Sequence, residues 1–172
     1  MIAKAPQGTI TRGTTNPNRL RRIDRFIARL PLLSKNVRPI VVDLGYGAAA
    51  TTAVELAARL QAVNPAVELL GIEIDPERVA AAKNFESAQL HFIRGGFEIP
   101  LTSELEAIAH GKVHVIRALN VLRQYDESEV RSAWSLMQSL QLVGGWKPGS
   151  NLFEQVRFAV ARKLPQRPQY GA

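Results

Sequence analysis

The stretch Pro-Ile-Val-Val-Asp-Leu-Gly-Tyr-Gly at residues 39–47 decides how the rest of the sequence is interpreted. Its apolar run is typical of a buried strand, and the two glycines at its end permit a tight turn. Residues 48–63, rich in Ala and Leu, predict a helix directly after the turn. A helix N-terminus in this position offers free N–H groups and a partial positive charge, which suit a carboxylate or a pyrophosphate. We therefore expect a cofactor site at this turn.

A second strand and helix are predicted at residues 67–84. Residues 67–74 read Val-Glu-Leu-Leu-Gly-Ile-Glu-Ile, and Asp75-Pro76 then supplies a helix cap and a first helical residue. Glu73 ends the strand, where a carboxylate can bind both hydroxyls of a ribose. Because consecutive parallel strands usually lie side by side, the glycine turn and Glu73 should face one crevice.

The rest of the chain continues this alternation. Further strands are predicted at 89–93 and 113–117, and further helices at 17–30, 103–110 and 126–140. The order favours an α/β fold, a Rossmann-like doubly wound sheet that is mostly parallel, with incomplete C-terminal strands. We expect a basic N-terminal segment and helix (1–37), a Rossmann-like cofactor-binding domain (38–143) and an atypical, partly disordered tail (144–172).

Composition narrows the classes of protein to consider. The 172 residues include no cysteine, which excludes disulfides, Cys-based zinc sites and a Cys nucleophile. No stretch approaches the roughly 20 apolar residues of a membrane span. The N-terminus lacks the apolar core of a signal peptide, so we expect a cytoplasmic protein. No His, Asp or Glu pair has a convincing metal-ligand spacing.

Basic residues concentrate at the start of the chain. Residues 1–40 hold nine Lys and Arg against one Asp, whereas residues 41–150 hold nine against thirteen acidic residues. One face of the first predicted helix carries four arginines: Arg19, Arg22, Arg25 and Arg29. A phosphate backbone would fit this face, so a non-catalytic nucleic-acid-binding module is one alternative function. A solvated arginine face needs no ligand, however.

Two cofactor classes fit the glycine turn. Gly45-x-Gly47-x-x-Ala50 matches the dinucleotide fingerprint, which makes an NAD(P)-dependent oxidoreductase a second alternative. Asp43 favours a different cofactor. A pyrophosphate gains nothing from a carboxylate two residues before the first glycine, whereas a cofactor with an amino group and a sulfonium does.

Residues 41–49 (Val-Val-Asp-Leu-Gly-Tyr-Gly-Ala-Ala) and 71–82 (Gly-Ile-Glu-Ile-Asp-Pro-Glu-Arg-Val-Ala-Ala-Ala) resemble the class I S-adenosylmethionine-dependent methyltransferases. The resemblance covers about residues 38–143. It implies S-adenosyl-L-methionine as the cofactor and methyl transfer to an unidentified acceptor, such as a small molecule. The implied cofactor contacts are Asp43, Gly45, Tyr46 and Gly47 at the methionine end, Glu73 at the ribose, and Ile74 and Phe97 at the adenine. A phenylalanine in this position is more often a core residue than an adenine contact.

The sequence departs from this family in three places. The third glycine of the family's loop is Ala49 here, a mild change. Residues 94–97 read Arg-Gly-Gly-Phe, without the acid that often contacts the adenine amine there. No Asn/Asp-Pro-Pro-aromatic motif follows the fourth strand, which argues against methylation of exocyclic nucleobase amines. The lack of cysteine also argues against methylation at carbon 5 of cytosine, which needs a thiolate.

The segment after the fourth strand lies where substrates bind in this architecture, at the carboxyl end of the sheet. Two arginines and a tyrosine there would suit an anionic or aromatic acceptor, and solvated loop residues fit the pattern equally well. We predict substrate contacts at Arg117, Arg123 and Gln124, and catalytic candidates at Asn120 and Tyr125. His114 lies mid-strand between apolar residues, which is more typical of a core histidine than of a base.

Both ends of the chain leave alternatives open. The family's sheet usually has seven strands, whereas this sequence predicts four, and its composition changes near residue 142. One interpretation is a truncated or frameshifted form of a longer enzyme, and the other is a naturally short variant. At the start, the polar residues 11–16 would fit either a lid over the cofactor or an ordinary coil.

Overall fold

The computed structural model describes residues 6–10, 16–109, 113–119 and 121–140. Within them lies one four-stranded sheet with the order β3-β2-β1-β4, in which every pairing is parallel. The strands are β1 (Ile40–Leu44), β2 (Glu68–Glu73), β3 (Leu90–Arg94) and β4 (Val115–Arg117). The predicted α/β, Rossmann-like parallel sheet is thereby confirmed. The predicted tail, residues 144–172, lies outside the described residues.

Helices alternate with these strands in the predicted order. They are α1 (Pro17–Ile27), α2 (Pro31–Lys35), α3 (Thr51–Gln61), α4 (Pro76–Ala82), α5 (Ser103–Ala109) and α6 (Glu127–Ser139), with 3-10 turns at Lys83–Phe85 and Val121–Gln124. The expected caps are present, since the side chains of Asn16 and Asp75 accept hydrogen bonds from the first turns of α1 and α4. One expectation differs: Pro31 both follows the first helix and begins a second, because proline suits a first helical position.

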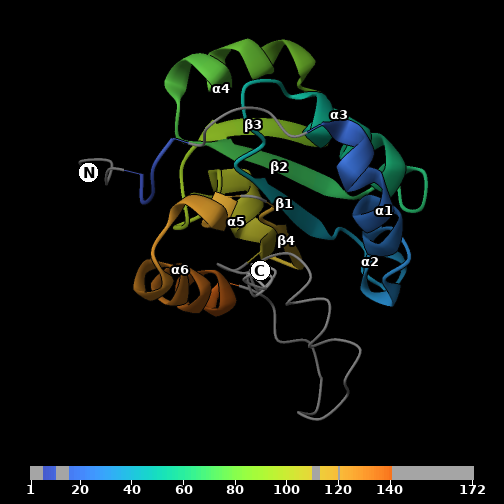
Figure 1. Cartoon of the computed structure of the whole chain (residues 1–172). Coiled ribbons are helices and arrows are strands. Elements are labelled where there is room, and N and C mark those ends of the chain that lie inside the picture. The colour runs from blue at the N-terminus through green and yellow to red at the C-terminus, as the bar shows by residue number, and fades with distance from the viewer. Residues whose placement is uncertain (1–5, 11–15, 110–112, 120, 141–172) are drawn as a thin grey trace, which may run out of the picture.

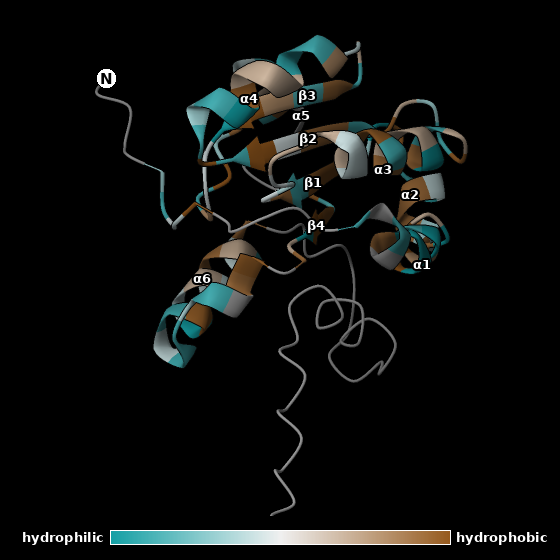
Figure 2. Cartoon of the chain, turned by 45° about the horizontal axis from the view of Figure 1, so that its top comes forward, coloured by the Kyte–Doolittle hydropathy of each residue, from teal (hydrophilic) through white to brown (hydrophobic). Residues whose placement is uncertain are grey.

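The sheet is covered on both faces (Figure 1). Helices α1 to α4 pack on one face, in a core that includes Leu33, Val41 and Leu56. Helices α5 and α6 cover the other face, where Val42, Leu105 and Met137 are buried. In Figure 2 the strands carry most of the brown, hydrophobic colour, whereas the helices alternate between brown and teal. The side chains of successive strand residues therefore pack into the two cores on opposite faces of the sheet, as burial on both faces of a parallel sheet requires.

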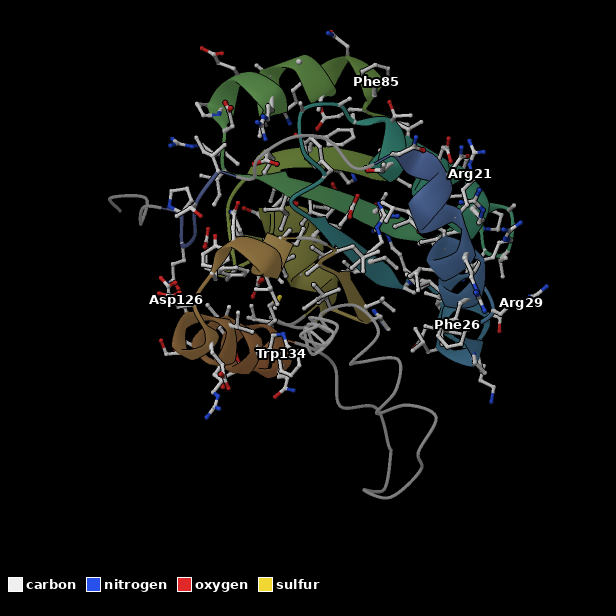
Figure 3. The ribbon with its side chains drawn as sticks, in the orientation of Figure 1. Arg21, Phe26, Arg29, Phe85, Asp126 and Trp134 are labelled. Atoms are coloured by element: carbon white, nitrogen blue, oxygen red, sulfur yellow. The ribbon has the colours of Figure 1, made fainter. Side chains whose placement is uncertain are left out.

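The basic helix α1 uses one face for packing and leaves the other at the surface. Leu20 and Ile27 are buried, and α1 packs against α3. Arg22, Arg25 and Arg29 are exposed, and Figure 3 shows Arg29 extending outward beyond Phe26. The expected nucleic-acid surface therefore stays a prediction. Among the described residues, no helix has the length and apolar character needed to cross a membrane.

Candidate cofactor site

The glycine turn after β1 has the backbone geometry that requires glycine. Gly45 has a φ of 70° and Gly47 a φ of 87°, in the left-handed region that other residues rarely adopt. The N–H of Gly45 donates to the carbonyl of Ile72, 2.7 Å away, which ties the turn to the neighbouring strand. The turn therefore begins directly beside the carboxyl end of β2, as the sequence predicts.

Glu73 joins the end of β2 to this turn. Glu73 is 2% exposed. Oε2 accepts a hydrogen bond of 3.1 Å from the N–H of Gly47, and Oε1 accepts one of 2.9 Å from the N–H of Ile74. The Arg78 guanidinium lies 3.8 Å from Oε2. The buried Glu73 carboxylate thus lies at the edge of the crevice and accepts hydrogen bonds from backbone N–H groups. The hydroxyl of a ligand in the crevice could donate to the same carboxylate.

Asp43 points into a buried ion-pair cluster. Arg117 is its register partner on β4, and the Arg117 side chain is fully buried. The guanidinium contacts both carboxylate oxygens of Asp43 and donates to Asp24 Oδ1 at 2.6 Å. Burial alone would lower the pKa of Arg117, but these two carboxylates raise it above its usual range. Arg59 also donates to Asp24, which links α1 and α3 to the cluster.

This cluster corrects two expectations. Arg117 was predicted to contact substrate, yet its guanidinium is enclosed between α1, α3 and the sheet, where the carboxylates of Asp24 and Asp43 compensate its buried charge. Asp43 was predicted to line the methionine end of the cofactor. In this structure both of its oxygens contact Arg117, and Asp43 is not among the residues that line the crevice.

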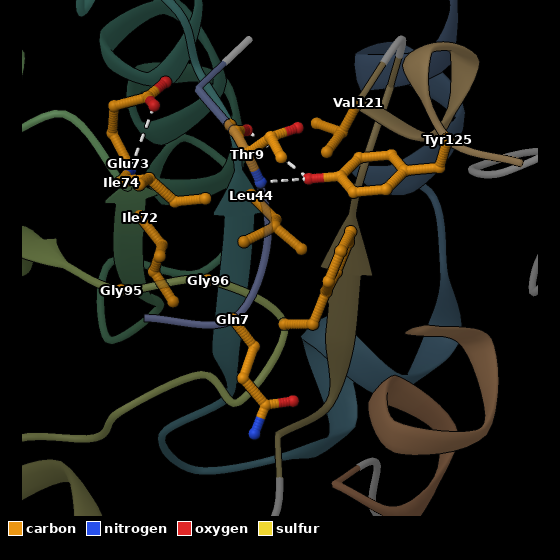
Figure 4. Close-up of a pocket in the computed structure, with 12 residues that line it drawn as sticks. Gln7, Thr9, Leu44, Ile72, Glu73, Ile74, Gly95, Gly96, Val121 and Tyr125 are labelled. Atoms are coloured by element: carbon orange, nitrogen blue, oxygen red, sulfur yellow. Dashed lines mark hydrogen bonds between the residues drawn. The ribbon is translucent and has the colours of Figure 1, made fainter. Parts of the chain in front are cut away.

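The crevice at the carboxyl end of the sheet combines several expected residues with unexpected ones (Figure 4). Of the predicted cofactor residues, Gly45, Glu73, Ile74 and Phe97 line it, whereas Tyr46 and Gly47 do not. Tyr46 packs edge to face against Phe92, with 5.2 Å between ring centroids, and burial raises its pKa. Residues that the sequence did not single out complete the lining: Gln7, Thr9, Leu44, Ile72, Gly95, Gly96 and Val121.

The catalytic and substrate candidates separate in the structure. Tyr125 lines the crevice and contacts Phe97 edge to face, with 5.3 Å between centroids. Gln124 does not line it; its side chain donates to the carbonyl and the hydroxyl of Thr9 instead. Asn120 and the side chain of Arg123 lie outside the described part of the chain. His114 accepts a hydrogen bond from the N–H of Ile40, away from the crevice, as a core histidine would.

The N-terminal segment 6–10 is the main part of the site that the sequence did not reveal. The residues of this segment that line the crevice come earlier in the chain than the lid expected at residues 11–16. Of that expected lid, residues 11–15 are outside the described residues. The Gly95-Gly96 pair was the available signal. A Cβ on Gly96 would lie 1.9 Å from the carbonyl oxygen of Gln7, so the segment requires glycine there. Among the described residues, no group of three or more His, Asp or Glu could hold a metal ion.

No family model matches the chain, and no curated protein matches its sequence. Solved structures do match. A candidate methyltransferase from Thermobifida fusca YX has a TM-score of 0.57 at 17% sequence identity, over 73% of this chain and 48% of that chain. The N-methyltransferase NodS from Bradyrhizobium japonicum WM9 has a TM-score of 0.46 at 16% identity, over 75% of this chain and 65% of that chain.

The first of these likenesses, with the parallel sheet described above, shows the fold of the chain. It is a methyltransferase fold of the Rossmann-like class, which confirms the predicted resemblance at the level of the fold. The chain spans about half the length (48%) of the Thermobifida structure.

Proposed function

We propose that the crevice binds S-adenosyl-L-methionine and that the chain belongs to a methyl-transferring enzyme. The observation that carries the proposal is the contact between Glu73 and the N–H of Gly47, because it brings a buried carboxylate and a left-handed glycine turn to one edge of a methyltransferase fold. A glycine turn beside a strand-end carboxylate is the arrangement that binds a ribose-containing cofactor in folds of this class.

The proposed contacts follow from the lining of the crevice. Glu73 would accept hydrogen bonds from the ribose hydroxyls, and the glycine turn, at Gly45, would receive the methionine end. Ile74 and Phe97 would lie on the two sides of the adenine. When bound, the cofactor supplies an electrophilic methyl group on sulfonium, and displacement at that carbon depends mainly on alignment of the two reactants.

A second hollow adjoins the crevice and is our proposed site for the methyl acceptor. Phe97 and Tyr125 line both spaces, and one face of α6 with Ser128, Ser132 and Leu136 forms the far wall. Tyr125 would position the acceptor or accept its proton. Arg123 and Asn120 stay predictions for the same region. Because Arg117 is buried, it gives no support to an anionic acceptor.

The choice between adenosyl and dinucleotide cofactors now rests on the fold. Asp43 was the residue that separated them, and its contacts with Arg117 remove that distinction. The experiment is calorimetry of the chain with S-adenosylmethionine, S-adenosylhomocysteine and NAD in parallel. We expect binding of both adenosyl ligands and none of NAD. Binding of NAD alone would contradict the proposal.

A further inference from the structure

The backbone of Gln7 is bonded to the loop that follows β3. The N–H of Phe97 donates to the carbonyl of Gln7 at 3.0 Å, and the N–H of Gln7 donates to Glu98 Oε2 at 2.8 Å. The same Glu98 carboxylate accepts from the N–H of Gly96, 2.8 Å away. These bonds place the N-terminal segment directly across the carboxyl edge of the sheet.

Gly8 then lies between the two side chains that would enclose an adenine. A Cβ on Gly8 would lie 3.0 Å from Ile74 Cδ1, 3.4 Å from Phe97 Cε2 and 2.8 Å from the Tyr125 hydroxyl. Its φ of 130° is also one that other residues rarely adopt. The segment is therefore closely fitted into this slot, and only glycine fits at its centre.

Thr9 is held by the segment that precedes α6. Its N–H donates to the Tyr125 hydroxyl, and its carbonyl accepts from Gln124 Nε2 at 3.1 Å. Figure 4 shows Thr9 beside Tyr125, with Gln7 below. With the segment in place, the crevice has a cavity volume of only about 10 Å³, far less than the roughly 300–1,000 Å³ of ordinary ligand pockets.

We propose that residues 7–9 are an intramolecular blocking segment that occupies the adenine position and competes with the adenosyl cofactor. The inference rests on the function proposed above. It differs from a lid, because a lid closes over a bound ligand, whereas this segment lies where the ligand would be. The apparent affinity for the cofactor is then reduced by the fraction of molecules in which the segment is released.

The test uses two variants. In Gly8→Val the added side chain prevents the segment from returning to the slot, and Gln124→Ala removes the hydrogen bonds to Thr9 without changing a residue that lines the crevice. S-adenosylhomocysteine is titrated by calorimetry, and thermal melting checks that each variant folds. If the segment is closed about nine-tenths of the time, Gly8→Val lowers the apparent Kd about tenfold. Gln124→Ala gives a smaller decrease, and Ala81→Val on the exposed side of α4 is the matched control without effect.

Amide exchange gives a second readout on the unaltered chain. Adding S-adenosylhomocysteine should accelerate exchange at the N–H groups of Gln7 and Thr9, because displacement breaks their bonds to Glu98 and Tyr125. A lid would slow exchange at both. If the parent chain binds but Gly8→Val and Gln124→Ala bind no tighter, or exchange slows, the blocking segment is wrong and the proposed function stands. If neither the parent nor any variant binds adenosyl ligands, both are wrong.

Discussion

Strand β2 begins and ends with a buried glutamate, and the two are held in different ways. Glu68 at its start is 1% exposed, and Glu73 at its end is 2% exposed. Glu68 accepts from Arg38 Nε at 2.7 Å and lies 3.1 Å from His91 Nε2. Glu73 accepts hydrogen bonds from the backbone N–H groups of Gly47 and Ile74, and the Arg78 guanidinium lies farther away, 3.8 Å from its Oε2. The two glutamates are therefore equally buried but differ in the kind of group that donates to them.

The partner decides whether a buried carboxylate is available to a ligand. A side-chain cation supplies both charge and hydrogen bonds, so removing it leaves an uncompensated buried charge. Backbone donors on a turn leave lone pairs of the carboxylate for a hydroxyl at the open edge of the sheet. On this argument Glu68 and Asp43 stabilise the fold, whereas Glu73, whose cationic neighbour Arg78 lies 3.8 Å away, is the carboxylate that we propose for binding.

The largest effect is expected where the side-chain pairing is completely buried. Arg117→Met leaves Asp24 and Asp43 without their main partner, and we expect a loss of about 3–5 kcal/mol in the free energy of unfolding. Urea denaturation measures it. Arg131→Met removes an exposed pair with Glu127 on α6 and serves as the control, with a change of about 0.5 kcal/mol or less. A loss below about 1 kcal/mol for Arg117→Met would show that the cluster is not essential to the fold.

Glu73→Gln should act on binding more than on stability. Loss of charged hydrogen bonds to the ribose is expected to weaken S-adenosylhomocysteine about 10- to 100-fold, the equivalent of about 1.5–3 kcal/mol. Calorimetry measures the change, and Glu77→Gln on the exposed start of α4 is the control. Unchanged affinity in a folded Glu73→Gln protein would remove Glu73 from the proposed site.

Glu68→Gln is the reciprocal experiment on the same strand. We expect unfolding to become easier by about 1–2 kcal/mol, since Arg38 is partly exposed and retains some solvation. The Kd for adenosyl ligands should stay within about twofold of the parent value, which corresponds to a binding free-energy change of only about 0.4 kcal/mol. If Glu68→Gln impaired binding as strongly as Glu73→Gln, the contrast between the two ends of β2 would be lost.

The smallest effect concerns pH at the amino end of the sheet. Burial lowers the pKa of His114, whose Nδ1 accepts from the N–H of Ile40. As pH falls, His114 is therefore protonated in the unfolded chain before it is protonated in the folded chain. The contribution of neutral His114 to the free energy of unfolding is complete above the unfolded-state pKa of about 6.5 and is lost as pH falls from there through the lower folded-state pKa. Because the ring is only partly buried, we expect below about 1 kcal/mol between pH 7 and pH 5. Unfolding midpoints of the parent and His114→Gln, compared across this range, test it, and identical pH profiles would contradict it.

Local sequence patterns predicted the elements and the half of the site that lies close together in the chain. The glycine turn, Glu73 and the order of strands and helices follow from hydrophobic periodicity, caps and glycine, which act within a few residues. Gly45, Gly47 and Glu73 therefore lie at one edge of the sheet, as expected. The role of Asp43 was not predictable in this way, because its partner Arg117 is brought to it only by the pairing of β4 with β1.

What the sequence alone determined is thus the parallel α/β architecture and the position of a crevice at the carboxyl end of its sheet. Only the tertiary structure decided which charged groups face that crevice and which compensate one another inside the core. It also decided that Gly8 lies between Ile74 and Phe97. The physical reason is distance along the chain: Thr9 and Tyr125 are 116 residues apart, and contacts of this separation depend on the packing of the whole fold rather than on any local pattern.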